Sequence, residues 1–392
     1  MRLPSLYEGQ FAGKRVFVRV DYNVPLQDGV IQDDRRIRAS LPTLRYLLEQ
    51  GVSLVLASHL GRPKGAPDPK YSLAPVAKHL STLLERPVSL ISDWAHPHPP
   101  EPGEIVLLEN LRFHPGETQN DPDFARLLAQ WADVYVCDAF GSVHRAHASV
   151  EALPKLFPQR YAGLLLLAEW ENAQRVLSHI THPYLLIIGG AKVADKLPIL
   201  HNLLDKIDRL LIGGGMSYTF LKAQNLPIGK SLCEDEHLEA ARTLLATLES
   251  QGKKFLLPAD SVAAPQFAED APARVFPHLP GQFPDDYLGL DIGPQTIASA
   301  KTFIQGAKTI LWNGPMGVFE WKTFQTGTLR IAQFVAEETQ AGAYSLIGGG
   351  DTASAIEMLG LSDKVSFVST GGGALLELLS GQTLPGIEAL LS

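Results

Sequence analysis

The sequence predicts an α/β protein of two doubly wound lobes, each a mainly parallel sheet flanked by helices, joined by a hinge helix. Short apolar runs alternate with longer amphipathic stretches from end to end, which is typical of parallel strands covered by helices on both faces. The chain has 392 residues, and this length corresponds to between two and three domains at roughly 150 residues each. A proline-punctuated segment at residues 153–158 predicts a domain boundary.

The expected strands are the short, mainly apolar runs, because strands buried on both faces lack the polar alternation of half-exposed strands. In the first lobe they lie at residues 16–20, 53–57, 105–108 and 134–137, and amphipathic patterns at residues 38–50 and 122–131 predict helices between them. In the second lobe strands are expected at residues 184–188, 209–212, 254–257, 309–312, 344–347 and 365–369.

Four segments follow from this order of elements. Residues 1–162 are expected to form the first domain, and residues 163–178 a linking helix that ends before the break at His182-Pro183. Residues 179–374 are expected to form the second domain. The last segment, residues 375–392, contains Pro385 and Gly386 and is expected to return to the first domain.

Composition narrows the class of protein. Lys and Arg number 34 and Asp and Glu number 42, giving a net charge of −8, whereas proteins that bind nucleic acid usually carry a basic face. The two cysteines, Cys137 and Cys233, form no disulfide framework, which fits a reducing compartment. No apolar stretch has the length of a signal peptide core or a membrane span. We therefore expect a cytoplasmic protein whose partners include neither nucleic acid nor membrane.

Basic and polar side chains follow each strand of the first lobe. In open parallel sheets ligands bind beyond the carboxyl ends of the strands, so these side chains are expected at one edge. A single such residue is usually just solvated, but repetition after four strands predicts a site for a small polyanion, since arginine matches carboxylate and phosphate geometry. The spacing of His144 and His147 also resembles a metal site, although their basic surroundings disfavour zinc. The residues concerned are Asp21, Asn23, Arg36, His59, Arg62, Arg112, His114, His144, Arg145 and His147.

Glycine clusters follow strands of the second lobe instead. They occur in GGAK, GGGM, IGGGDT and STGGGA, each after an apolar run. Glycine lets the backbone approach a ligand closely, and free amides at a following helix start attract phosphate. One such element could be a plain turn, but four in one lobe predict a platform for a nucleotide.

Two charged features accompany these glycines. Lys192 and Lys196 are spaced i, i+4, which predicts that both lie on one face of a helix, directed at phosphate. Asp351 directly follows Gly348–Gly350, where a carboxylate suits Mg²⁺. Asp351 is also a candidate helix N-cap, and the two roles are compatible.

The standard nucleotide motifs are absent. There is no Walker A sequence, no G-x-G-x-x-G between a strand and a helix, no kinase HRD and DFG pair and no G-x-S-x-G elbow. A nicotinamide-dependent dehydrogenase would need the dinucleotide fingerprint and its acidic residue. A non-catalytic two-lobe binding protein would usually carry an export signal. It would also not need four glycine clusters suited to binding phosphate. Both alternatives are therefore disfavoured.

Ten motifs in order resemble the phosphoglycerate kinase family, over about residues 17–384. They are VRVDYNVP, SHLGRP, LLENLRFHPGE, DAFGSVHRAHAS, GGAKVADK, GGGM, GLDIGPQT, LWNGPMGVFE, IGGGDTA and STGGGA. The resemblance implies a hinge-bending, monomeric, glycolytic transferase that moves a phosphoryl group reversibly between 1,3-bisphosphoglycerate and ADP. The first domain would bind the glycerate substrate and the second the nucleotide with Mg²⁺.

The resemblance also implies roles for individual residues. The substrate-binding residues would be Asp21, Asn23, Arg36, His59, Arg62, Arg112 and Arg145. The nucleotide-binding residues would be Lys196, Gly289, Asn313, Glu320, Gly349, Gly350, Asp351 and Thr352, with Asp351 holding the metal. The residues that act on the phosphoryl group in transit would be Arg36, Lys192, Gly349 and Gly372.

This chemistry explains why no general base is evident. The leaving group of an acyl phosphate is a carboxylate, which is already deprotonated at neutral pH when it attacks in the reverse direction. Catalysis then consists of alignment and of neutralising charge on the transferring group.

Overall fold

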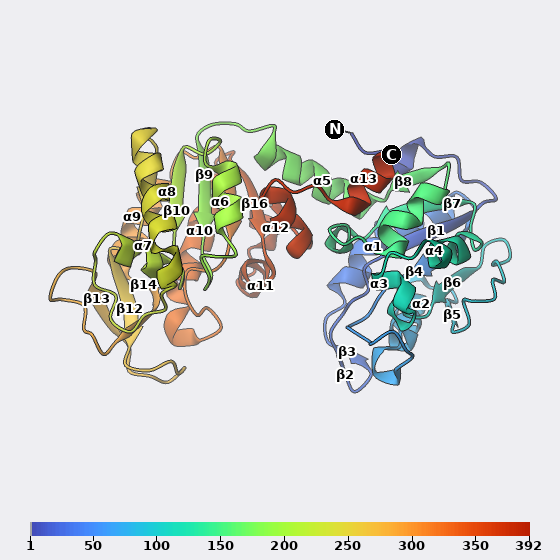
Figure 1. Cartoon of the computed structure of the whole chain (residues 1–392), viewed down its shortest axis with the longest axis horizontal. Coiled ribbons are helices and arrows are strands. Elements are labelled where there is room, and N and C mark those ends of the chain that lie inside the picture. The colour runs from blue at the N-terminus through green and yellow to red at the C-terminus, as the bar shows by residue number, and fades with distance from the viewer. Residues whose placement is uncertain (1) are drawn as a thin grey trace. The chain divides into compact units, whose positions relative to one another are not determined.

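The computed structural model describes residues 2–392 (Figure 1). The chain divides into two compact units. The first unit comprises Met1–Glu171 and Thr383–Ser392, and the second comprises Asn172–Gln382. Among residues 2–392, no helix combines the length and the apolar character that crossing a bilayer requires.

The first unit is built on a six-stranded parallel sheet in the order β5-β6-β4-β1-β7-β8. The central strands β4 and β7 are buried along their whole length, which is why they are mainly apolar. The strands are β1 (Arg15–Val20), β4 (Ser53–Ala57), β5 (Ser89–Ile91), β6 (Ile105–Leu108), β7 (Val134–Asp138) and β8 (Arg160–Ala162). The helices are α1 (Arg35–Glu49), α2 (Ala74–Leu84), α3 (Pro115–Thr118) and α4 (Pro122–Ala129), and a small hairpin joins β2 (Leu26–Gln27) to β3 (Val30–Ile31).

The second unit repeats this plan with the order β11-β10-β9-β15-β16-β17, again all parallel. The strands are β9 (Tyr184–Ile188), β10 (Arg209–Ile212), β11 (Lys254–Leu256), β15 (Thr309–Asn313), β16 (Tyr344–Gly348) and β17 (Phe367–Val368). The helices are α6 (Leu197–Leu203), α7 (Ser217–Ala223), α8 (Leu238–Ser250), α9 (Pro294–Ile304), α10 (Thr326–Gln340), α11 (Gly350–Met358) and α12 (Gly373–Leu379). The two doubly wound sheets confirm the predicted fold class.

The second unit also contains an antiparallel sheet that the sequence did not predict. It has the order β13-β12-β14, formed by Arg274–Pro277, Asp260–Ala264 and Leu288–Ile292. β13 is short and largely exposed, and the pairing of β12 with β14 shifts register between Val262 and Ala263. Neither feature leaves a local apolar period, so only the fold reveals this sheet.

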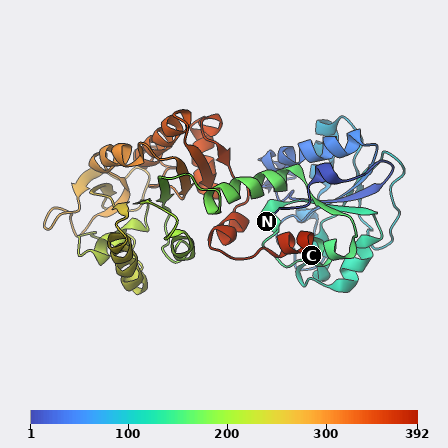
Figure 2. The same ribbon diagram turned by 90° about the horizontal axis from the view of Figure 1, so that it is seen from above.

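Helix α5 (Leu164–Leu177) links the two units, and each of its ends is bonded within one unit. At its start, the amides of Leu164 and Leu165 donate to Thr43 Oγ1 at 2.8 Å and to Asp138 Oδ1 at 2.9 Å. In its second half, Asn172 Oδ1 accepts the hydroxyl of Tyr344 at 2.8 Å. In Figure 2, α5 is the green helix.

The segment that returns to the first unit is shorter than the expected residues 375–392. α12 belongs to the second unit, where Asn202 donates to the carbonyl of Leu379 at 2.9 Å. Only the end of the chain returns, as α13 (Pro385–Leu391), seen in red against the first unit in Figure 2. The amide of Gly386 donates to the carbonyl of Val143 at 2.9 Å, and a side chain at Gly386 would collide with Val143 and Val150.

Candidate active site

The predicted polar residues of the first unit are joined by hydrogen bonds at the carboxyl edge of its sheet. Arg36, near the start of α1, donates to Asp21 Oδ2 at 2.9 Å. Gly61 joins two others, because its amide donates to Asn23 Oδ1 at 2.8 Å while its carbonyl accepts from Arg112 at 2.7 Å. Gly61 has a φ of +61°, and a Cβ there would lie 2.4 Å from the ring of Tyr71. A glycine is therefore required to connect the β1 and β6 ends of the site.

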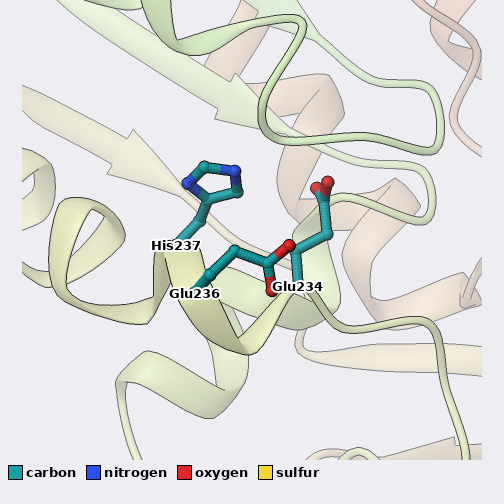
Figure 3. A group of neighbouring side chains, drawn as sticks. All are labelled: Glu234, Glu236 and His237. Carbon is teal, nitrogen blue, oxygen red and sulfur yellow. The ribbon is translucent and has the colours of Figure 1, made fainter.

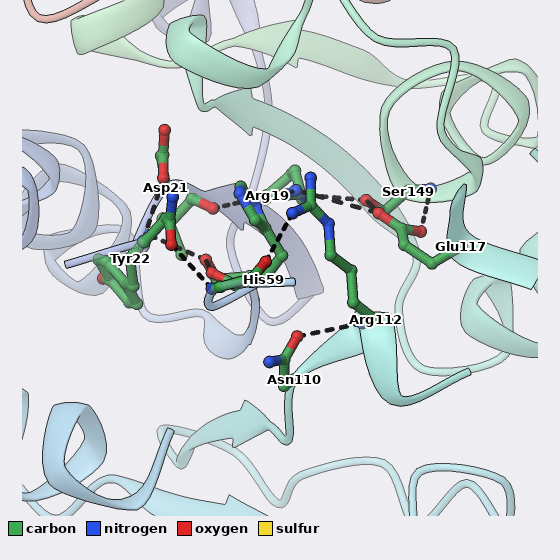
Figure 4. A network of polar contacts seen from close by, with 12 residues as sticks. Arg19, Asp21, Tyr22, His59, Asn110, Arg112, Glu117 and Ser149 are labelled. Atoms are coloured by element: carbon green, nitrogen blue, oxygen red, sulfur yellow. Dashed lines mark hydrogen bonds and ion pairs between the residues drawn. The ribbon is translucent and has the colours of Figure 1, made fainter. Parts of the chain in front are cut away.

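An arginine that sequence reasoning missed lies behind this edge. Arg19 is fully buried in β1. Its guanidinium donates to Ser149 Oγ at 2.7 Å and lies 3.1 Å from His59 Nδ1 (Figure 4). The sequence signal for Arg19 is a charged residue within the otherwise apolar run VFVRV. Arg19 lies inside the strand, whereas the predicted site residues all follow strands.

One buried carboxylate lies opposite this arginine. Glu117 Oε1 is 4.0 Å from the Arg19 guanidinium. Both of its oxygens also accept from Ser149, at 2.6 Å from the hydroxyl and at 2.9 Å from the amide. Glu117 therefore orients Arg19 and Ser149 together.

Burial and neighbouring positive charge together shift the pKa values of three residues at this edge. Burial and then Arg19, Arg112 and Arg145 lower the pKa of His59 well below its usual value. Burial and then Arg112, Arg19 and Arg145 lower the pKa of His147 to about 3. Burial and then Arg145 and Arg19 lower even the pKa of Arg112 to about 10. Because neighbouring arginines add to the effect of burial in all three cases, an anion bound at this edge would be stabilised.

Two predicted residues are less tightly held. Arg62 is exposed on the loop after β4. Arg145 donates to the ring of His144 at 3.2 Å, and its charge acts on His59 and His147. The structure thus brings together Asp21 with Arg36, Asn23 with Arg112 through Gly61, and His59 with Arg19.

The second unit has a pocket of about 330 Å³ at the carboxyl ends of β9, β15 and β16. Several of the predicted residues line it, namely Lys192, Lys196, Asn313, Gly349, Gly350, Asp351 and Thr352. Lining residues that were not predicted include Asp195, Pro315 and Leu376. Asp195 and Pro315 lie in loops and Leu376 lies in α12, so only the path of the folded chain brings these residues to the pocket.

Asn313 and Lys196 form the floor of this pocket. The ammonium of Lys196 donates to Asn313 Oδ1, and burial lowers the pKa of Lys196 while Asp195 and Asp351 oppose the shift. Asn313 is fully buried, and its Nδ2 has no hydrogen-bond partner. An unpaired buried donor costs about 1–3 kcal/mol, so an acceptor such as a phosphate oxygen would stabilise it. A Cβ at Gly349 would lie 2.9 Å from this nitrogen, so glycine keeps the approach open.

The two lysines do not share a helical face, contrary to the prediction from their spacing. α6 begins only at Leu197, and Lys192 lies in the preceding loop. Both lysines nevertheless line the pocket. The loop forms because Gly190 has a φ of +93° and turns the chain away from a helical path.

The first turn of α11 supplies amides and a carboxylate. Gly349, with a φ of +89°, is the N-cap residue and makes no side-chain cap bond, so the prediction that Asp351 caps this helix is wrong. Asp351 instead lies inside the first turn, exposed in the pocket wall. Thr352 Oγ1 accepts the amide of Gly314 at 2.7 Å, which ties α11 to the loop after β15. An exposed carboxylate beside free helix amides fits a metal–phosphate group, since Mg²⁺ takes oxygen ligands.

Three predicted residues are not among those that line the pocket. Gly289 lies in β14, where a Cβ would be 1.9 Å from the Tyr218 hydroxyl oxygen, and its amide donates to Ser231 Oγ at 2.8 Å. Glu320 is exposed on the loop that follows β15. Gly372 is the N-cap residue of α12, with a φ of +51°.

Comparison with known proteins identifies the family of this chain. The sequence model of the phosphoglycerate kinase family matches residues 6–382. The phosphoglycerate kinase of Solibacter usitatus is 49% identical over 395 residues, covering 98% of each chain, and the cytosolic one of Triticum aestivum is 48% identical over 393 residues. The solved phosphoglycerate kinase of Coxiella burnetii is 42% identical with a TM-score of 0.93, covering 100% of this chain and 99% of that one. The resemblance seen in the motifs is confirmed, and the chain belongs to the phosphoglycerate kinase family.

Proposed function

We propose that this kinase, which transfers a phosphoryl group reversibly between 1,3-bisphosphoglycerate and ADP, binds the glycerate substrate on its first unit and the nucleotide on its second. The observation that carries the division is the opposite character of the two sheet edges. At the first edge, several arginines lie near His59 and His147 and, together with burial, lower the pKa of both histidines. The second has glycine loops, an unpaired amide donor and a carboxylate around one pocket.

On the first unit, Arg36, Arg62, Arg112 and Arg145 would pair with the carboxylate and phosphate of the substrate, with His59, Asn23 and Asp21 as further polar contacts. Arginine suits both anions because its planar guanidinium donates two parallel hydrogen bonds. The Asp21 carboxylate holds Arg36 at 2.9 Å, so Arg36 is oriented before the substrate arrives. A preoriented side chain loses less conformational entropy on binding.

On the second unit, Lys196, Asn313 and the amides of Gly350 and Thr352 would hold the nucleotide phosphates. Gly349 leaves room for their close approach, and Gly289 and Glu320 are proposed as contacts further along the nucleotide. Mg²⁺ would bind Asp351 and, when bound, would neutralise charge on the phosphates.

The transfer step would rely on charge neutralisation. Lys192, Arg36 and the amides near Gly349 and Gly372 would stabilise the negative charge that spreads over the equatorial oxygens of the transferring group. The attacking and leaving groups are a carboxylate and a phosphate, so no side chain has to remove a proton.

Because the substrates are assigned to different units, transfer would require the units to close on one another. α5 is bonded to the first unit at one end and to the second unit at the other, so a change at this helix would move one unit relative to the other. Closure would bring the reacting atoms to within about 3–3.5 Å and exclude water that would hydrolyse the acyl phosphate. We further propose a monomer in the cytoplasm that binds neither nucleic acid nor membrane.

A coupled assay with ATP, Mg²⁺ and 3-phosphoglycerate, run beside calorimetry with each ligand, tests this assignment. We expect turnover that requires all three components. Variants of Arg112 should lose affinity for 3-phosphoglycerate, and variants of Asn313 should lose affinity for nucleotide. The division between the units would be refuted if Arg112 variants lost nucleotide affinity while still binding 3-phosphoglycerate normally.

A further inference from the structure

We propose that Glu234 is a positioning residue for Lys192. The carboxylate of Glu234 accepts the backbone N–H of Val193, the residue that directly follows Lys192. Through this bond Glu234 would hold the loop that presents the lysine to the transferring phosphoryl group. The inference rests on the role proposed above for Lys192.

The loop from Gly189 to Lys196 is fixed at both ends but sparsely held between them. At its start, the amide of Gly190 donates to the carbonyl of Pro315 and the carbonyl of Gly190 accepts the amide of Met216, each at 2.9 Å. At its end, the carbonyl of Val193 accepts the amides of Lys196 and Leu197 at 2.9 and 3.0 Å. Lys192 itself is exposed, so its position depends on the backbone of its neighbours.

Val193 is the residue that anchors the middle of this loop. It is fully buried, and a buried backbone amide is costly if it lacks a partner. Glu234 provides that partner across 41 positions of sequence. A carboxylate bonded to an amide makes a hydrogen bond roughly twice as strong as a neutral one, so this contact is well suited to hold one loop conformation.

Glu234 is itself held in place by the body of the second unit. Its amide donates to Thr219 Oγ1 at 3.1 Å, and Thr219 is buried in α7. The chain of contacts therefore runs from α7 through Glu234 to Val193 and so to Lys192. An exposed loop is in this way connected to a rigid helix of the fold.

The same glutamate belongs to a group that resembles a metal site. Ligand atoms of Glu234, Glu236 and His237 lie within 4.8 Å of one another (Figure 3). One carboxylate oxygen of Glu234 already accepts from Val193, so a cation would compete with the backbone for this side chain. Exposed acidic groups are common without an ion, and the positioning role uses a contact that the structure does contain.

Loss of this contact should reduce transfer more than binding. Displacing a catalytic group by about 1 Å can reduce rate by about 10²-fold, and a loosened loop should give a smaller, partial effect. We expect Glu234→Ala to lower kcat about 10-fold, while the KM values for MgATP and 3-phosphoglycerate change by less than about 3-fold. Glu234→Gln retains an oxygen acceptor for Val193 and should recover most of the lost rate. The matched control is Glu236→Ala, at an exposed position two residues away, which should leave kcat unchanged.

A double-mutant cycle with Lys192→Ala decides the route of the effect. If Glu234 acts by placing Lys192, the loss from Glu234→Ala should disappear in the Lys192→Ala background, because residues that act as a unit are not additive. The inference would be overturned if kcat of the double variant fell by the product of the two single-variant losses, in variants with unchanged circular dichroism and melting temperature. If Lys192→Ala alone kept normal kcat, the proposed role of Lys192 would be wrong, and the Glu234 single variants would then report only on the loop. A kcat for Glu234→Ala within about 2-fold of the wild type would also overturn the inference.

Discussion

The guanidinium of Arg19 lies 3.1 Å from Nδ1 of His59, and both side chains are buried. Arg19 can only donate, so His59 accepts at Nδ1 and is neutral, with its proton on Nε2. This agrees with the lowered pKa of His59, for which burial and Arg19 are the two largest causes. The edge of the first sheet therefore keeps His59 and His147 uncharged while its arginines carry the positive charge.

An anion bound at this edge should raise the pKa of His147, which stands at about 3 without one. Negative charge on the ligand would offset the arginines, so binding 3-phosphoglycerate between pH 5 and 6 should be accompanied by proton uptake. Calorimetry in buffers of different ionisation enthalpy measures the uptake. The phosphate of the ligand titrates near pH 6 in its own right, so the comparison with His147→Gln isolates the protein's part. Identical uptake in both proteins would show that His147 does not titrate on binding.

Arg36→Ala should leave the fold intact and nearly abolish transfer. Arg36 is partly exposed and pairs with Asp21 at 2.9 Å, so no core packing is lost. If Arg36 stabilises charge on the moving phosphoryl group, kcat should fall on the order of 10²–10³-fold, as for one preorganised donor. Steady-state kinetics with both substrates saturating measures this. An unchanged kcat would refute the assignment.

Lys196→Ala should weaken nucleotide binding more than glycerate binding. The lysine bonds to Asn313 on the floor of the second-unit pocket, and removing it also leaves the buried Asn313 oxygen without its donor. Separate titrations with MgADP and 3-phosphoglycerate measure the two affinities. Equal weakening of both ligands would indicate that the lysine acts on the structure as a whole.

Closure of the two units should require both ligands. Each ligand contacts mainly one unit in the proposed arrangement, so neither alone has much differential affinity for a closed state. Small-angle scattering should show the largest fall in radius of gyration in the ternary complex. The hinge proposal would fail if apo, binary and ternary samples, with binding demonstrated, had the same radius of gyration.

Asp291 should make the second unit less stable as pH rises. Burial raises the pKa of this carboxyl to about 8, although it accepts the amides of Gly327 and Ile292 at 2.7 and 2.9 Å. A raised folded-state pKa contributes stability that is present below the unfolded value near 4 and is lost as pH rises through 8.

The amide of Asp291→Asn does not ionise, so the variant should gain stability relative to the wild type between pH 5 and pH 9. The expected gain is on the order of 1–3 kcal/mol. Urea unfolding at the two pH values measures it, with the exposed Asp286→Asn as control. A difference that does not vary with pH would mean that Asp291 is ionised in the folded protein throughout this range.

Much of the fold and of the site is encoded locally. The strands at Tyr184–Ile188, Arg209–Ile212 and Ser53–Ala57 begin and end where the apolar runs predicted, because burial on both faces favours apolar side chains along most of each run. The residues at the strand ends could also be predicted, since the carboxyl ends of parallel strands meet at one edge. Motif order was sufficient to indicate the family.

Only the tertiary structure determined which strands pair and which partners the buried polar groups have. The antiparallel sheet around Asp260–Ala264 depends on pairing between distant segments and on a shift of register, which leave no local period. The i, i+4 spacing of Lys192 and Lys196 predicted a helix, but Gly190 bonds to Pro315 and Met216 and the chain forms a loop until α6 begins at Leu197. The pairs Arg19 with His59 and Val193 with Glu234 are 40 and 41 positions apart. A local sequence pattern records which residues are buried, whereas the partner of a buried polar group is chosen by the path of the whole chain.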